Sequence, residues 1–256
     1  MLKHIVMKKI TLTLSLIAVL VLSETSQAVT IDGTFGLAEW AGYYAAEDGV
    51  SGNGFVGPGY GGQSFDAEYI GLKIENGKVN FGLQTGFNLQ SGVLYGGTLY
   101  TPGDFAIDVN NDNTYDYAID FSISSNVPSY NLYSVSSWDH VQYSQHAIAD
   151  PLQYSVGTLI PTIFSGAYGS GVYSNNIDGG TSYVLEGNFD LGLLALYNGG
   201  PIKLHWTMSC GNDYLDVTSS PVPEPGTLLL LGSGLSGMLI WRWLSERRRY
   251  RLSPSK

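Results

Sequence analysis

Four oxygen-bearing side chains have the spacing of calcium ligands. They lie at relative positions 1, 3, 5 and 9 of one short stretch: Asp108, Asn110, Asp112 and Asp116. Calcium-binding loops surround one ion with alternating oxygen ligands and a backbone carbonyl near position 7. However, Asn113 stands where such loops carry glycine, and Ile119 stands where a bidentate glutamate would end the loop, so Asp120 would have to substitute. The stretch is either a Ca²⁺ site, the one cofactor that the sequence suggests, or a hairpin turn built from Asn and Asp.

Residues that could catalyse hydrolysis are scattered along the chain. Glu68 and Glu186 fall on predicted strands, where two carboxylates could converge as in glycoside hydrolases, although a solvent-facing position explains them more simply. Three histidines lie in a predicted polar loop or strand: His140, His146 and His205. The sequence contains neither a Gly-x-Ser-x-Gly elbow nor a His-Glu-x-x-His motif. We therefore predict no catalytic residues and no enzyme.

Aromatic side chains are abundant enough to suggest stacking on sugar rings. Residues 29–222 contain 17 Tyr besides Trp40, Trp138 and Trp206. Trp138 is the favoured contact because it falls in a predicted polar loop, and Trp40 and Tyr60 are further candidates. The alternative is that most of the rings line the core or decorate adhesive loops, since Tyr is common in strands.

Short alternating strands must position these side chains. Asn76-Gly77 predicts a hairpin between residues 65–74 and 79–84, and a second hairpin joins 105–109 to 115–121. Further strands are expected at 130–136, 182–189, 202–208 and 214–217, and a helical turn at 191–197 with Asp190 as its N-cap. Such strands predict an all-β protein, an antiparallel β-sandwich with long Gly-rich loops such as 49–62. Cys210 is alone and is expected to be buried.

Charge divides the chain into three parts. Residues 1–28 have a net charge of +2 and residues 223–256 of +4, whereas 29–222 carry three Lys against 19 acidic residues, a charge of −16. A middle part of this length is expected to form one domain. Nucleic acid is excluded as a partner because affinity for phosphate needs clustered Lys and Arg.

Residues 1–28 resemble a signal peptide. Lys8-Lys9 precede the apolar run 12–22, and Ser26-Gln27-Ala28 supply the small residues that signal peptidase requires. Either Met1 or Met7 could begin the chain. The apolar run is shorter than the ~20 residues of a spanning helix, so cleavage is expected rather than anchoring.

The C-terminal part, 223–256, combines a helix breaker, an apolar run and a cationic stop. Pro223-Glu224-Pro225 is followed by an apolar stretch and then by Arg247, Arg248 and Arg249, which predicts a transmembrane helix with a cytoplasmic C-terminus. Residues 222–251 resemble the PEP-CTERM sorting signal of Gram-negative bacteria, a tail also named the ice-binding protein C-terminal domain. The resemblance implies recognition by an exosortase, cleavage near Pro223–Pro225 and release or transfer to the exterior. The alternative is an ordinary membrane anchor.

The middle part resembles carbohydrate-binding modules of the CBM9 type and their DOMON-like relatives. Ile31-Asp32-Gly33 with Glu39-Trp40 matches their start, and 103–108, 117–119 and 183–189 match later strands. The resemblance implies a sandwich that binds sugar, but a pair of ligand-clamping Trp residues is missing. Some relatives bind haem through Met and His; here Met208 and His205 would point to opposite faces of a strand, which disfavours haem.

Together these features predict an exported protein of the envelope or extracellular matrix with a binding or structural role. Before processing, its C-terminal helix would hold it on the outer side of the inner membrane. A CBM9-like carbohydrate-binding module is the alternative, and a glycan-active hydrolase is a remote one. Exosortase and signal peptidase are the expected partners during export, with an extracellular polysaccharide as a further partner.

Overall fold

A computed structural model describes residues 27–47, 56–57, 60–177, 179–220, 231–239 and 242. The chain divides into two compact units, one of residues 27–222 and the other of residues 1–26 and 223–256. In the second unit, residues 231–239 are α-helical. Among the described residues, no helix combines the length and the apolar character needed to cross a membrane. Residues 1–26 of the predicted signal peptide lie outside the described residues, and the predicted transmembrane helix is described only at 231–239 and 242.

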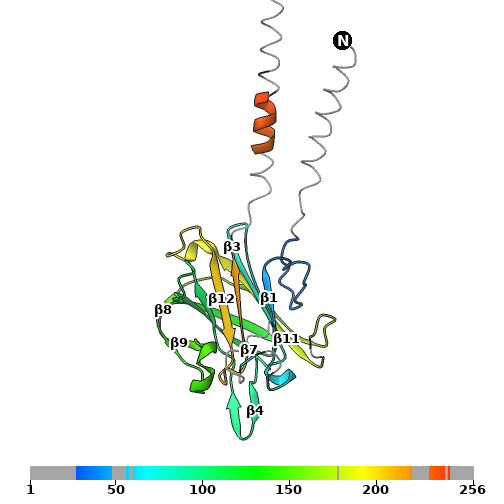
Figure 1. Ribbon diagram of the computed structural model, residues 1–256, viewed down its shortest axis with the longest axis vertical. Helices are drawn as coiled ribbons and strands as arrows, with labels where there is room; N and C mark the ends of the chain where they lie inside the picture. The colour runs from blue at the N-terminus through cyan, green and yellow to red at the C-terminus, as the bar shows by residue number, and fades with distance from the viewer. Residues whose placement is uncertain are drawn as a thin grey trace, which may run out of the picture. The chain divides into compact units, whose positions relative to one another are not determined.

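The unit 27–222 consists mainly of antiparallel sheets, consistent with the predicted β-sandwich (Figure 1). One sheet has the order β1 (Tyr44–Ala46), β2 (Ala67–Glu75), β3 (Lys78–Thr85), β11 (Ser182–Asp190) and β10 (Ser165–Gly171). The other has the order β13 (Tyr214–Ser219), β12 (Ile202–Thr207), β6 (Phe105–Asp108), β7 (Tyr117–Ser124), β8 (Val127–Asp139) and β9 (Gln153–Ile160). A separate hairpin joins β4 (Val93–Tyr95) to β5 (Thr98–Tyr100). The 3₁₀ turns are η1 (Gln63–Phe65), η2 (Ser144–Ala149) and η3 (Leu191–Leu193).

The core forms between the two sheets because alternate residues of their strands are apolar. Leu72 and Phe81 of the five-stranded sheet belong to the same buried cluster as Phe105, Leu204 and Trp206 of the six-stranded sheet. Burial of this apolar surface is the main favourable contribution to folding. Among the described residues, every strand and every buried cluster lies within 27–222, so this unit has its own core and can be produced alone as a domain.

The two predicted hairpins are confirmed. Asn76 and Gly77 both have positive φ, of 53° and 71°, as the two-residue turn between β2 and β3 requires. β6 pairs with β7, although β7 begins at Tyr117, two residues later than predicted. The predicted helical turn shortens to η3, which Asp190 caps by accepting a hydrogen bond from the Gly192 N–H at 2.7 Å.

Several strands differ from the prediction. β8 extends through Trp138, which the sequence had suggested to be in a polar loop. β9 and β10 are additional strands, and neither has a regular alternation of buried and exposed residues. Strand propensity therefore gave little signal there, and pairing with β8 and β11 determines their conformation.

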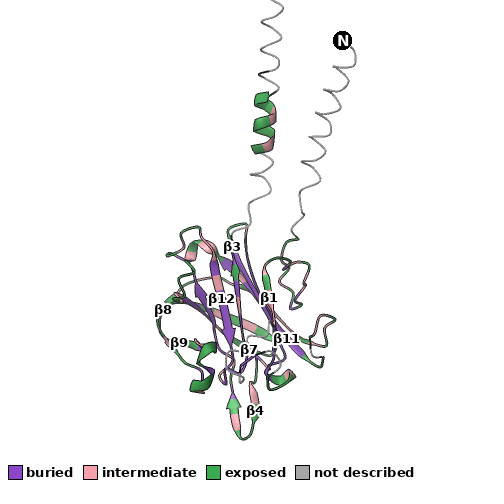
Figure 2. Ribbon diagram, in the orientation of Figure 1, coloured by how far each residue is buried: buried purple, intermediate pink, exposed green. Residues whose placement is uncertain are grey.

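An N-terminal segment, residues 27–43, covers the outer face of the five-stranded sheet. Its Phe35 and Trp40 are buried against Tyr69 and Val184, and the four form a second apolar cluster, here the outer-face cluster. Figure 2 shows how strands such as β12 of the opposite sheet are largely buried. The indole of Trp40 lies directly over Gly71, where an added Cβ would come within 2.5 Å of the ring. Glycine in β2 thus makes room for the largest side chain of the segment.

Candidate functional site

Polar side chains lie beneath the N-terminal segment, where the sequence predicted a solvent-facing surface. Glu68 on β2 and Glu186 on β11 are both fully buried, so the prediction that they face solvent is wrong. Gln84, on the strand between them, donates to Glu68 at 2.5 Å. Asn175 in turn donates to Gln84 at 3.0 Å. The burial of Glu186 could not be predicted locally because Asp32 and Gly33, which contact its carboxyl, are distant in sequence.

Glu186 holds the N-terminal segment in place. Its Oε2 accepts hydrogen bonds from the backbone N–H groups of Asp32 at 3.2 Å and Gly33 at 3.0 Å. Burial raises the pKa of Glu186 to about 7 against the effect of these bonds. The Trp40 indole N–H also opposes the increase in pKa, but no hydrogen bond of ordinary geometry joins it to the carboxyl. The Glu186 carboxyl thus fixes the segment through Oε2, whereas its buried Oε1 has no hydrogen-bond partner of ordinary geometry among the described residues.

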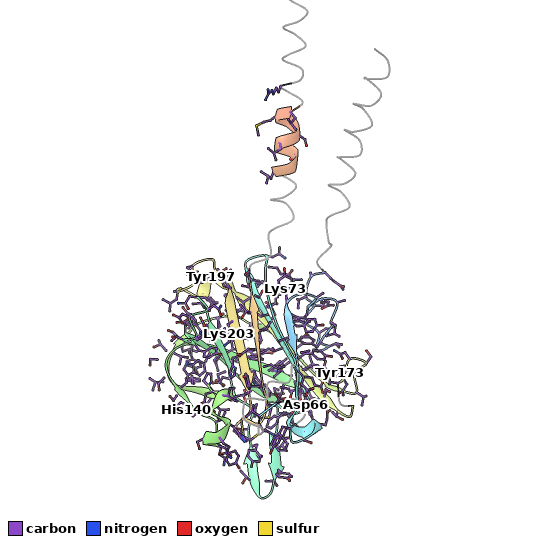
Figure 3. The ribbon with its side chains drawn as sticks, in the orientation of Figure 1. Asp66, Lys73, His140, Tyr173, Tyr197 and Lys203 are labelled. Atoms are coloured by element: carbon purple, nitrogen blue, oxygen red, sulfur yellow. The ribbon has the colours of Figure 1, made fainter. Side chains whose placement is uncertain are left out.

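A second charged group fixes the beginning of the segment. Lys73 is fully buried and pairs with Glu75 Oε2 at 3.2 Å. Its Nζ donates to the carbonyl oxygens of Gln27 and Glu39. Glu75 Oε1 accepts a hydrogen bond from the Val29 N–H at 3.1 Å. Figure 3 shows Lys73 and Asp66 near opposite ends of β2.

At the Asp66 end, three acidic side chains converge that the sequence analysis did not select. Glu47, Asp66 and Asp213 each have a possible ligand atom, and these atoms all lie within 4.8 Å of one another. Asp213 accepts the N–H groups of Ala67 and Tyr214, both at 2.8 Å. Burial raises the pKa of Asp213 to about 8, and the charges of Asp66 and Glu47 add to the increase.

This acidic cluster is the group of described residues whose geometry suits a metal ion. Carboxylates this close repel one another, so either a proton or a cation must reduce their charge. No motif in the sequence indicated this cluster, because Asp66 and Asp213 are 147 positions apart. They come together only in the folded domain, where the two sheets pack against each other.

The predicted calcium loop folds as a hydrogen-bonded turn. Asp108 is fully buried, and its two oxygens accept the N–H groups of Asn110, Asp112 and Asn113 at 3.2, 3.2 and 2.7 Å. Asp116 accepts the Val109 N–H at 3.1 Å, so its carboxyl also takes part in the turn. Asn111 and Asn113 have positive φ, of 56° and 67°, as Asn tolerates in turns. Ca²⁺ binding here stays a prediction.

The role of Asp108 can be measured in the domain 27–222. Asp108→Ala leaves three backbone N–H groups without their acceptor, so we expect it to lower the free energy of unfolding by about 2–3 kcal/mol in chelator. If the loop also holds Ca²⁺, millimolar Ca²⁺ should raise the midpoint temperature of thermal unfolding of the unmodified domain. It should not raise the midpoint temperature of the Asp112→Ala variant. Identical melting curves for the unmodified domain in Ca²⁺ and chelator would exclude the ion. An unchanged midpoint in Asp108→Ala would contradict the turn.

The three candidate histidines do not form a catalytic triad with other described residues. His205 Nδ1 lies 2.7 Å from Asp216 Oδ1, but its Nε2 faces the carbonyl oxygens of Ala149 and Pro151 at 3.1 Å each. This ring therefore has no nitrogen free to accept a proton from a nucleophile. His140 is exposed at 2.9 Å from Asp150, and His146 is buried against the Cys210 carbonyl.

His205 helps to keep the Asp216 carboxyl ionised. The pKa of this carboxyl is lowered although burial alone would raise it, because the hydrogen bond and charge of His205 and the charge of Lys203 outweigh burial. Cys210 is buried as expected, and burial raises the pKa of its thiol to about 11, so the reactive thiolate is scarce at neutral pH.

The predicted ligand-contacting aromatics are not brought together. Trp40 is fully buried in the outer-face cluster. Trp138 is half-buried, donates to the Tyr115 carbonyl at 3.0 Å and packs edge-on against the Tyr115 ring. Tyr60 is 45% exposed in a turn. A hollow of about 250 Å³ is lined by residues 34–37 and 173–175, which include none of these three.

The strongest family evidence lies at the C-terminal end of the chain, beyond the sandwich. Residues 221–248 match the PEP-CTERM protein-sorting motif. The PEP-CTERM motif implies that an exosortase-type system sorts the chain to the exterior from a membrane-anchored precursor, as the tail resemblance predicted. Pro223, Glu224, Pro225 and the arginines Arg247 and Arg248 fall within the match. No curated protein and no solved structure matches the chain, so the resemblance of the middle part to CBM9 and DOMON-like modules is not supported.

Proposed function

We propose that the chain is a precursor whose sandwich domain, once released by an exosortase, serves as a structural or binding component of the cell envelope or extracellular matrix. The observation that carries the proposal is the PEP-CTERM motif following a domain with its own core. We infer a role exerted through the surface of the domain, since the motif directs the whole domain to the exterior.

Processing tests this proposal directly. In a host with an exosortase, protein from the envelope or medium should begin near Val29 and lack the peptides that follow Arg242. Replacement of Pro223, Glu224 and Pro225 by Ala should leave the C-terminal peptides in place and keep the protein with the inner membrane. Mass spectrometry of each fraction provides the measurement. Intact Arg247–Arg251 peptides in the bulk exported protein would refute cleavage.

Cleavage after Ala28 would also create a new contact. The backbone N–H of Val29 becomes an α-ammonium group, placed 3.1 Å from Glu75 Oε1 in the uncleaved chain. A charged donor strengthens such a bond, so we expect the domain that begins at Val29 to be about 1 kcal/mol more stable than its N-acetylated form. Thermal unfolding measures the difference, and Glu75→Gln should remove it. Equal midpoints for the free and acetylated domains would contradict the contact.

The carbohydrate-binding alternative has a separate test. A glycan array probed with the domain 27–222 should show no binding above background, because Trp40 is buried and Trp138 packs on Tyr115. Saturable binding to one saccharide class, lost in Trp138→Ala, would restore the alternative.

The remote hydrolase alternative predicts turnover of a glycan that depends on Glu68 or Glu186. Both carboxyl groups are buried within hydrogen-bond networks.

A further inference from the structure

The outer edge of the six-stranded sheet is open along β9. β9 pairs with β8 on one side and is the last strand in the order of that sheet, on the left flank in Figure 1. Among the described residues, two contacts outside the strand ladder involve its backbone: the Tyr154 N–H donates to Asp104, and the Val156 carbonyl accepts from Ser136. The stretch from 155 to 159 is exposed throughout. A free edge of this kind offers a row of backbone donors and acceptors to another strand.

The other edge strands of the two large sheets have the protection that natural sheets ordinarily use. β1 is three residues long, and β13 has the charged Asp216 in an ion pair with Lys203. β10 lies against the N-terminal segment: a Cβ on Gly33 would come within 2.9 Å of the Tyr168 backbone, and the Tyr173 hydroxyl donates to the Gly33 carbonyl. β9 has neither a charged residue nor a proline, and among the described residues no segment pairs with its outer edge.

Most of the surface around β9 is also uncharged, in contrast with the rest of the domain; the nearby acidic residues are at the beginning of the strand, where Gln153 donates to Asp139 and the Tyr154 N–H donates to Asp104. Residues 151–177 and 121–138 contain no Asp, Glu, Lys, Arg or His, although 29–222 has three Lys against 19 acidic residues. Apolar side chains are exposed here: Val156 to 58%, Leu159 to 52% and, just after the strand, Ile163 to 92%. Such a combination of free backbone and exposed apolar groups favours association with a neutral strand.

We propose that β9 pairs with β9 of a second copy of this chain, antiparallel about a twofold axis, so that two six-stranded sheets become continuous. Two copies with a charge of −16 repel each other, and the uncharged flank is where they can approach with the least repulsion. A twofold pair uses the same edge on both copies and is closed, so it leaves no further β9 edge to extend. This inference does not depend on the proposed sorting.

Sedimentation velocity of the domain 27–222 over about a hundredfold range of concentration tests the proposal. We expect a reversible monomer–dimer equilibrium and no larger species. Added salt should strengthen it, because salt screens the repulsion between acidic copies and an uncharged edge has no ion pairs to lose. A monomer at every concentration, open-ended aggregates, or a dimer that salt weakens would each overturn the proposal.

Variants locate the interface. Val156→Lys places a charge on the edge and should weaken dimerisation at least about tenfold, and Thr158→Pro should do the same. Leu94→Lys is the matched control, because Leu94 is a 72% exposed apolar residue on the separate β4–β5 hairpin. Circular dichroism melting of dilute samples verifies that each variant is folded. A dimer that survives both β9 changes, or one that Leu94→Lys abolishes, would contradict pairing through β9.

Discussion

The domain 27–222 is expected to unfold at a temperature roughly 10 °C lower at pH 8 than at pH 5. Three buried carboxyl groups cause the effect. Burial raises the pKa of Asp104 to about 7, that of Glu186 to about 7 and that of Asp213 to about 8, from ordinary values near 4. These groups lie in different parts of the sandwich, so their contributions to the pH dependence should largely add.

The decrease in stability with rising pH follows from the number of protons that the folded and unfolded states bind. Between about pH 4 and pH 8, the folded domain keeps protons on these groups that the unfolded chain has already released. The folded state then binds more protons, so the free energy of unfolding falls as pH rises, by at most about 1.4 kcal/mol per pH unit for each group. Asp216, whose pKa is lowered, contributes in the opposite sense, but its contribution is lost only on acidification below this range.

Thermal unfolding from pH 5 to pH 8 at constant ionic strength provides the measurement, with chelator present so that no cation neutralises the acidic cluster. Asp213→Asn removes one titrating group and should make the dependence on pH visibly shallower. Asp112→Asn, on the exposed loop, is the control and should leave the slope unchanged. A midpoint that is constant or rises toward pH 8 would contradict the buried, protonated carboxyls.

Trp40→Ala is expected to lower the free energy of unfolding by about 3–5 kcal/mol, the range for removing a fully buried large aromatic side chain. Trp40 stacks on Phe35 with ring centroids 5.3 Å apart and fills the space above Gly71 and Gly82. The cavity would open between the N-terminal segment and the sheet. Loss of the ring also removes the contact that holds the segment over Glu186.

Trp138→Ala is the matched control, since Trp138 is half-buried at the end of β8 and should have a much smaller effect on stability. Denaturant unfolding of the two variants compares them. The variant Gly71→Val tests the same contact from the side of the sheet. Its side chain would collide with the Trp40 ring, so we expect a loss of unfolding free energy similar to that of Trp40→Ala. Equal losses in Trp40→Ala and Trp138→Ala would show that the segment is not held as described.

The sandwich was predictable where residues close in sequence determine the structure. Asn76-Gly77 and the alternating runs around it predicted the β2–β3 hairpin, and Asp190 predicted its own capping role. β9 and β10 were missed because glycine and serine interrupt their apolar pattern. The neighbouring strands, rather than local propensity, determine their conformation.

The candidate sites were less predictable, because they depend on contacts between distant parts of the chain. Nothing near Glu186 in the sequence indicates that residues 32 and 33 donate hydrogen bonds to it from 153 or more positions away. The Asp108 loop was recognised from its spacing, but the same residues suit both an ion and a turn, and only the backbone conformation showed that their oxygens bind N–H groups.

The placement of the N-terminal segment has a consequence for the timing of folding during export. If the chain crosses a membrane from its N-terminus, residues 27–43 emerge first, yet the Glu186 carboxyl that binds them is synthesised and translocated much later. Until β11 arrives, Phe35 and Trp40 have no complete sheet against which to pack. In that case the earliest part of the domain to cross the membrane is among the last to fold, and its apolar side chains stay exposed over that interval.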